Sequence, residues 1–263
     1  MANSIRNIIF DLGGVILNID PQLTVEAFRD LGWKDFFEEK NQTLNKDLFY
    51  NLEMGQSSPE AFRENVRNNT IHDISDVEID TAWSAMLLDI PAERVRYLEG
   101  LRIDYNLYLL SNTNEIHRMV FHQKFEDNFG YSLFGLFKHN FYSHEMGLRK
   151  PNPLIFVKAL ENAGLVAEET LFIDDMKDNT DAALTTGMKV LHIEPGTLLD
   201  RLPDYLKGMG CGVEGMGCGR AWVSCGLGRG EAEAREGKPV NKITKTATSL
   251  KHLQLSHSPV TSR

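Results

Sequence analysis

Short apolar runs separated by amphipathic stretches are the main pattern of this sequence. Four runs have the length and apolar character of buried parallel strands: Ile5–Phe10, Leu107–Leu110, Leu171–Ile173 and Lys189–Ile193. Three stretches with helical periodicity lie between the later runs: Asn114–Phe125, Pro153–Ala163 and Asn179–Thr186, the last followed by Gly187 as a stop. Strands that alternate with helices predict an α/β fold with a doubly wound parallel sheet.

Residues 19–96 interrupt this alternation. They contain no convincing strand, and a connection of about 80 residues is too long for a simple crossover. Four amphipathic stretches predict helices there: Gln22–Leu31, Leu44–Met54, Pro59–Arg67 and Val77–Leu87. We therefore expect a helical domain at 19–96, inserted into an α/β core formed by 1–18 and 97–207. Its expected place is over the carboxyl edge of the sheet, where ligands bind in open α/β folds.

The composition changes near Gly208. Residues 208–263 contain 10 of the 21 glycines, carry a net charge of +4 against −13 for the preceding residues, and show no sustained hydrophobic period. These features predict a disordered or non-native tail. The tail also holds the three cysteines, Cys211, Cys218 and Cys225, together with His252 and His257. Their spacing does not match the short cysteine pairs of zinc sites, and chance explains it better.

Overall composition narrows the class of protein further. The chain is 42% hydrophobic and 25% charged, as in ordinary globular proteins. The net charge of −9 argues against a nucleic-acid partner, which would require a basic face. No apolar stretch approaches the roughly 20 residues that span a bilayer, and Asp11 interrupts the N-terminal apolar run. We expect a cytoplasmic protein with no membrane partner, and the sequence makes no prediction of its oligomeric state.

Acidic residues follow two of the predicted strands. Asp11 comes directly after the first, in the segment FDLGGV, and Asp174 and Asp175 end the third, in FIDD. A carboxylate at the end of a buried strand is costly unless it is paired or coordinated. Each segment alone is also explained as a turn or as acids favourable to a helix start. Adjacent acids nevertheless invite a cation, and hard oxygen ligands suit Mg²⁺.

Two further segments carry groups that suit a phosphate. Ser111 and Asn112, in LLSNTN, offer a hydroxyl and backbone N–H groups at the start of a helix. Lys150, in GLRKP, offers a compact positive charge. Taken separately, these are a helix cap and a solvated loop lysine. Because we place all four segments at strand carboxyl ends, we expect them to converge on one edge of the sheet.

The four segments resemble, in order and spacing, the signature motifs of the haloacid dehalogenase-like (HAD) hydrolase superfamily, over about residues 5–195. The helical insert resembles the C1 cap of that superfamily, which closes over the site and selects substrates. The resemblance implies that Asp11 attacks phosphorus and forms an aspartyl-phosphate that water hydrolyses. It implies that Ser111 and the Asn112 amide hold phosphoryl oxygens and that Lys150 stabilises the nucleophile and the transferring group. The implied Mg²⁺ ligands are Asp11, the backbone carbonyl of Gly13, Asp174 and Asp175.

The sequence departs from the resembled family at Gly13. Phosphatases of the superfamily usually carry there a second aspartate, which serves as general acid and base. Such help is worth about 10²–10⁴-fold in rate. The FDLGGV form resembles a branch that includes glucose-1-phosphatase-like proteins, so we expect a small phosphorylated metabolite, and a sugar phosphate in particular, as the substrate. Tyr50, Glu53 and Met54 are candidates for contacts between the cap and that substrate.

Two other functions stay open at this point. In a metal-independent 2-haloacid dehalogenase, Asp11 would attack carbon, but the paired acids Asp174 and Asp175 count against it, as does Gly13 where that branch has an aromatic residue. The absence of the second aspartate also allows a catalytically weak regulatory domain that binds a phosphorylated ligand. Chloride release in EDTA would favour the first, and ligand binding without turnover would favour the second.

Overall fold

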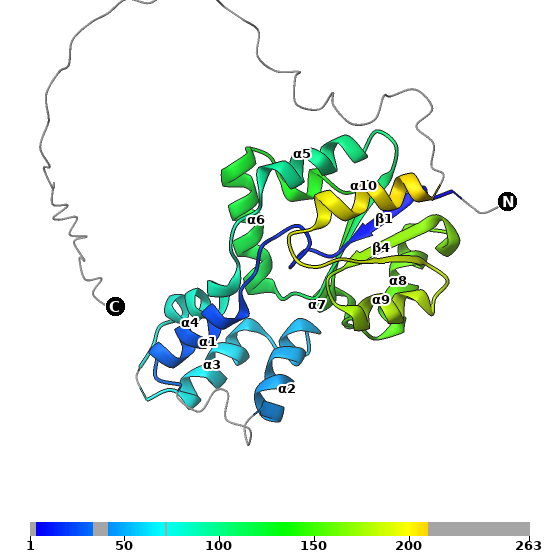
Figure 1. Ribbon diagram of the computed structural model, residues 1–263. Coiled ribbons are helices and arrows are strands. Elements are labelled where there is room, and N and C mark those ends of the chain that lie inside the picture. Colours follow the sequence, from blue (N-terminus) through cyan, green and yellow to red (C-terminus); the bar gives the residue numbers. More distant parts are fainter. Residues whose placement is uncertain (1–3, 34–41, 72, 210–263) are drawn as a thin grey trace, which may run out of the picture. The chain divides into compact units, whose positions relative to one another are not determined.

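A five-stranded parallel sheet forms the centre of the α/β core (Figure 1). The computed structural model describes residues 4–33, 42–71 and 73–209. The strands, in chain order, are β1 (Asn7–Phe10), β2 (Asn106–Ser111), β3 (His139–Tyr142), β4 (Thr170–Asp174) and β5 (Lys189–His192). Their spatial order is β3-β2-β1-β4-β5, so the direction of winding reverses at β1. The prediction of a doubly wound parallel sheet is confirmed.

Helices cover both faces of this sheet because strand side chains alternate between them. Ile8 and Phe10 of β1 point to the face that packs against α5 (Ala92–Leu101), α6 (Glu115–Phe129) and α10 (Leu198–Gly208). Ile9 points to the opposite face, where it packs with residues of α8 (Pro153–Ala163) and α9 (Lys177–Leu184). All four β1 residues are buried, which explains the continuous apolar run.

The insert between β1 and β2 is helical, as the sequence predicts. Its elements are α1 (Pro21–Asp30), α2 (Gln42–Glu53), α3 (Pro59–Asn69), α4 (Asp76–Trp83) and the 3₁₀ turn η2 (Ser84–Met86). A separate apolar cluster centred on Phe28, Phe62 and Trp83 holds these helices together and also takes in Ile116 of α6. We call α1–α4 and η2 the cap helices; Figure 1 shows them to one side of the sheet.

The chain enters and leaves the cap helices along two paired segments. The Asn18 amide donates to the Asp89 carbonyl at 2.9 Å, and the Leu88 amide donates to the Asn18 carbonyl at the same distance. Beyond this pairing, α5 packs through Val95 and Leu98 into the apolar cluster of the sheet. The domain boundary predicted at residue 96 therefore falls inside a helix of the α/β core.

Six elements of the described part of the chain were not predicted. They are β3, α5, α10 and the short helix α7 (Ser143–Met146), and the 3₁₀ turns η3 (Leu133–Gly135) and η4 (Ala167–Glu169) complete the list. No helix within the described ranges is long and apolar enough to cross a membrane. The predictions for the tail, including those for its cysteines, lie outside the described residues.

Candidate active site

Lys150 lies between two of the predicted aspartates. Its Nζ is 2.7 Å from Asp11 Oδ1 and 2.7 Å from Asp174 Oδ2. The lysine side chain is only 1% exposed, and that of Asp174 is fully buried. The loop after β1, the end of β4 and the segment before α8 thus bring three charged groups into one buried cluster at the sheet edge where the strand order reverses.

The charges in this cluster are mutually dependent. Burial disfavours the Lys150 ammonium, but the carboxylates of Asp11 and Asp174 and their hydrogen bonds outweigh it, so the pKa of Lys150 is raised and the side chain stays charged. Burial raises the pKa of Asp11 to about 7, opposed by Lys150 and reinforced by the charge of Asp174. One ammonium does not balance all the acids here, which favours the binding of a further cation.

Asp174 is held in a single orientation by the first turn of α9. Asn179 Nδ2 donates to both of its oxygens, at 3.0 and 3.1 Å, and the Met176 amide donates to Oδ1 at 2.8 Å. Lys150 Nζ also donates to Oδ2, so both oxygens of this carboxylate accept hydrogen bonds from fixed donors. Asn179 was not singled out from the sequence, although its place in the helix that follows FIDD was a usable signal.

Asp11, Asp174 and Asp175 form a group that suits a metal ion. One carboxylate oxygen from each lies within 4.8 Å of the others. Gly14, at φ +75°, permits the approach of Asp175, because a Cβ at that position would lie 2.3 Å from Asp175 Oδ2. Burial and the charge of Asp174 raise the pKa of Asp175. Hard carboxylate oxygens on a rigid, glycine-lined turn fit Mg²⁺.

Ser111 and Asn112 lie at the carboxyl end of β2, beside this cluster. Ser111 is the last residue of β2 and is buried, whereas Asn112 is half-buried. The Asn112 side chain donates from Nδ2 to the Lys150 carbonyl at 2.9 Å and accepts at Oδ1 from the Lys150 amide at 2.8 Å. This pairing was not predicted. It fixes the main chain of Lys150. The backbone amide of Asn112, which is the group expected to hold phosphate, takes no part in this pairing.

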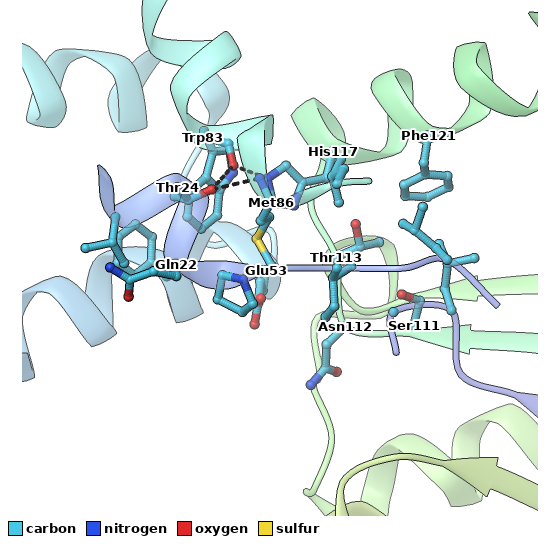
Figure 2. A pocket seen from close by; sticks show the side chains of 18 residues that line it. Gln22, Thr24, Glu53, Trp83, Met86, Ser111, Asn112, Thr113, His117 and Phe121 are labelled. Carbon is cyan, nitrogen blue, oxygen red and sulfur yellow. Dashed lines mark hydrogen bonds between the residues drawn. The ribbon is translucent and has the colours of Figure 1, made fainter. Parts of the chain in front are cut away.

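A cavity of about 470 Å³ opens next to Ser111 and Asn112 (Figure 2). Gly13, Ser111 and Asn112 line its sheet side, and most of the remaining wall is apolar. The cap helices contribute Phe49, Glu53 and Trp83. This volume is in the range of small-molecule sites. The cap helices and the α/β core therefore share one cavity beside the buried charges.

Glu53, one of the three cap residues singled out from the sequence, lines this cavity. Its Oε2 accepts a hydrogen bond from Arg149 Nε at 2.9 Å, and the Arg149 guanidinium stacks on the Tyr50 ring at 3.6 Å from its centroid. Tyr50 therefore contacts Arg149 and is not among the residues that line the cavity; Met54 is not among them either. The partner, Arg149, was overlooked although it stands next to Lys150.

One detail of the expected arrangement is wrong. The segment that contains Lys150 does not follow any strand predicted from the sequence: it follows α7, which in turn follows the unpredicted β3. Conversely, the predicted strand at Lys189–Ile193, which is β5 (Lys189–His192), carries none of the four segments. The convergence at the sheet edge holds for Asp11, Ser111, Asn112, Lys150, Asp174 and Asp175.

Comparison with known proteins defines the family. The profile of the haloacid dehalogenase-like hydrolases matches residues 5–184. D-ribitol-5-phosphate phosphatase of Bacteroides thetaiotaomicron is 31% identical over 193 residues, which cover 73% of this chain and 93% of that protein. The crystal structure of a HAD family enzyme from the same organism has a TM-score of 0.71 at 34% identity, covering 76% of this chain and 100% of that one. A second crystal structure of that enzyme, in complex with magnesium and inorganic phosphate, has a TM-score of 0.69 at 35% identity, with 73% and 96% covered.

The chain belongs to the haloacid dehalogenase-like hydrolases. The predictions of this family, of its α/β fold and of an enzyme are confirmed, and the relatives just described include a named phosphatase.

Proposed function

We propose that this protein is a Mg²⁺-dependent phosphatase that hydrolyses a small phosphate ester of the sugar or polyol class, with Asp11 as the nucleophile. The observation that carries the proposal is the contact of 2.7 Å between Lys150 Nζ and Asp11 Oδ1. Their chain neighbours and hydrogen-bond partners Leu12, Gly13 and Asn112 line the cavity that cap and core share. A lysine fixed there holds the nucleophile in place and offers a positive charge to an incoming phosphoryl group.

Each of the residues at the site has a separate role in the proposed reaction. An oxygen of Asp11 attacks phosphorus in line with the departing oxygen and gives an aspartyl-phosphate, which water then hydrolyses. Ser111 and the Asn112 amide hold the phosphoryl oxygens, and Lys150 stabilises their charge. The Asn112 side chain keeps Lys150 in position.

The acidic group would hold the metal through the carboxylates of Asp11, Asp174 and Asp175, joined by the backbone carbonyl of Gly13. When bound, Mg²⁺ supplies positive charge to the transferring phosphoryl group. Asn179 and the Met176 amide orient Asp174 for this task. Such orientation of a ligand by neighbouring donors raises metal affinity.

The substrate class rests on the named relative and on the size of the cavity. The relative of 31% identity is a phosphatase of D-ribitol 5-phosphate. A cavity of about 470 Å³ admits a monophosphate with an organic part of a few carbons and leaves no room for a macromolecule.

The test is phosphate release from a panel of sugar and polyol monophosphates, with and without Mg²⁺, by the unaltered protein and by Asp11→Asn. We expect turnover that requires Mg²⁺ and is lost in the variant. Absence of phosphate release across the panel would overturn the proposal, and chloride release from 2-haloacids in EDTA would replace it with dehalogenation.

A further inference from the structure

Gly13 leaves the proposed reaction without a proton donor at its usual place. The space next to Gly13 is also occupied: a Cβ on this residue would lie 3.2 Å from Ile19 Cδ1, so an apolar side chain fills the position beside it. An alkoxide leaving group needs a proton, and the attacking water must lose one. Some other group at the cavity has to handle these protons.

Two residues among the described ones that line the cavity are titratable in the useful range, Glu53 and His117. His117 is buried, and its Nε2 lies 3.0 Å from the Trp83 carbonyl, so Nε2 carries the proton and donates it to that carbonyl. Burial lowers the pKa of His117 to about 4, which keeps the ring neutral. Its single proton is thus already used within the fold, and His117 has none to give.

Glu53, in contrast to His117, has an oxygen that is not used in a hydrogen bond within the described fold. Arg149 occupies only Oε2, and no partner for Oε1 exists among residues 4–33, 42–71 and 73–209. Figure 2 shows the side chain entering the cavity from the cap side, across from the loop of Asn112 and Thr113. The Glu53 carboxyl group and the residues proposed to hold phosphate, Ser111 and Asn112, therefore line the same cavity.

The electrostatic surroundings fit a group that changes its protonation during a reaction. Burial raises the pKa of Glu53, while the charges of Arg149 and Lys150, the two cations that act on it, pull the pKa down. The net shift is upward. A carboxyl group with a pKa moved toward neutrality serves both as acid and as base.

We propose that Glu53 supplies the proton transfers that Gly13 cannot, a role that rests on the phosphatase function proposed above. In the first step an Asp11 oxygen bonds to phosphorus, the bond from phosphorus to the ester oxygen breaks, and that oxygen takes the proton of Glu53. In the second step the Glu53 carboxylate takes a proton from water, the water oxygen bonds to phosphorus, and the bond to Asp11 breaks. Phosphate, alcohol, ionised Asp11 and protonated Glu53 result.

The test compares Glu53→Gln with the unaltered protein on two esters. Gln keeps the size of the side chain and an oxygen for Arg149 but cannot transfer a proton. On a polyol monophosphate, which has a poor leaving group, kcat should fall about 10²–10⁴-fold. On p-nitrophenyl phosphate, whose leaving group departs without a proton, the variant should release one p-nitrophenolate per enzyme in a rapid burst. Slow turnover follows, because hydrolysis of the aspartyl-phosphate still needs a base.

Glu64→Gln is the matched control, since Glu64 is an exposed glutamate of the cap helix α3. It should keep the kcat of the unaltered protein on both esters. Unchanged kcat in Glu53→Gln would overturn the inference. So would an equal loss on both esters without a burst, which is the result expected if Glu53 only holds the cap through Arg149. No turnover of either ester by the unaltered protein would overturn the proposed function itself, and this role with it.

Discussion

The side chain of Asn112 and the main chain of Lys150 form a pair of reciprocal hydrogen bonds, at 2.9 and 2.8 Å, across 38 positions of the sequence. Asn112 follows the second strand of the chain, and Lys150 belongs to the loop before α8. The pair therefore locks the loop that presents the lysine onto the loop that is proposed to bind phosphate. Through Asn112, the two halves of the site share one rigid support.

Replacement of Asn112 by Ala should weaken both the fold and catalysis. The Lys150 amide and carbonyl would lose their partners, and a buried polar group left unpaired costs about 1–3 kcal/mol. We expect the free energy of unfolding to fall by about this amount in urea titrations and kcat to fall because Lys150 loses its fixed position. Asn68→Ala, at an exposed position of α3, is the control and should change stability by less than about 0.5 kcal/mol. Equal behaviour of the two variants would contradict the positioning role of Asn112.

Replacement of Lys150 by Met should leave a buried cluster of acids without its ammonium. Removal of one partner from a buried ion pair costs about 3–5 kcal/mol. The pKa of Asp11 in the folded state, about 7, is already above its ordinary value of 3.8, and loss of the positive charge raises it further. The folded variant therefore binds this proton still more readily than the unfolded chain does. The destabilisation of the variant should therefore be largest at alkaline pH and shrink as the pH falls through that pKa.

The same variant gives a test with metal. Added Mg²⁺ should restore part of the stability of Lys150→Met, because a cation bound to the three carboxylates compensates for the missing ammonium. Thermal unfolding with and without Mg²⁺ measures this. A melting temperature that does not respond to Mg²⁺ would argue against a cation site at Asp11, Asp174 and Asp175.

The sequence was informative wherever a single local pattern determines the result. The buried run of β1 and the glycine-rich turn after Asp11 were sufficient to place the proposed nucleophile at a strand end. Helix α8 was predicted with its observed bounds, because Pro153 starts it and Gly164 ends it. Strand β3 was missed because HNFY begins with two polar residues and has only two buried positions.

Contacts between residues far apart in the sequence could not be predicted from local sequence patterns. The contact of Asn112 with Lys150 and that of Glu53 with Arg149 depend on how distant segments pack, and no local pattern encodes them. The boundary of the insert was misplaced for a related reason. Helix α5 has the same amphipathic character as the cap helices, and only its packing through Val95 and Leu98 assigns it to the core.

His117 should make stability depend on pH below neutrality. Its pKa is lowered from 6.5 to about 4 in the folded state because the ring is buried, so the unfolded chain binds the proton more readily. Its contribution is fully present above pH 6.5 and is lost as the pH falls toward 4, and the shift corresponds to about 3 kcal/mol over this window. In His117→Gln, the loss of stability between pH 6.5 and 4 should be smaller by about that amount.

Urea titrations across this pH window measure the effect. Gln retains a donor for the Trp83 carbonyl, and we therefore expect the variant to fold. His139→Gln, at an exposed position of β3, is the control and should follow the unaltered protein. If His117→Gln also follows the unaltered protein, the ring is not held neutral by the fold.

Gly14 should be required for metal binding because a side chain there would displace Asp175. This effect can be measured separately from the backbone strain of the substitution. Gly14 and Gly130 both have φ of +75°, but a Cβ on Gly14 would meet Asp175 Oδ2 at 2.3 Å, whereas one on Gly130 would meet nothing within 4 Å. Alanine at either position carries the cost of a left-handed conformation, about 1–2 kcal/mol. Only Gly14→Ala must also push the Asp175 carboxylate away from Asp11 and Asp174. We therefore expect both variants to be less stable in urea, while only Gly14→Ala needs a higher Mg²⁺ concentration for half-maximal phosphatase activity and binds Mg²⁺ more weakly in calorimetry. If the two variants bind Mg²⁺ equally well, Asp175 does not belong to the metal site, and the site reduces to Asp11 and Asp174.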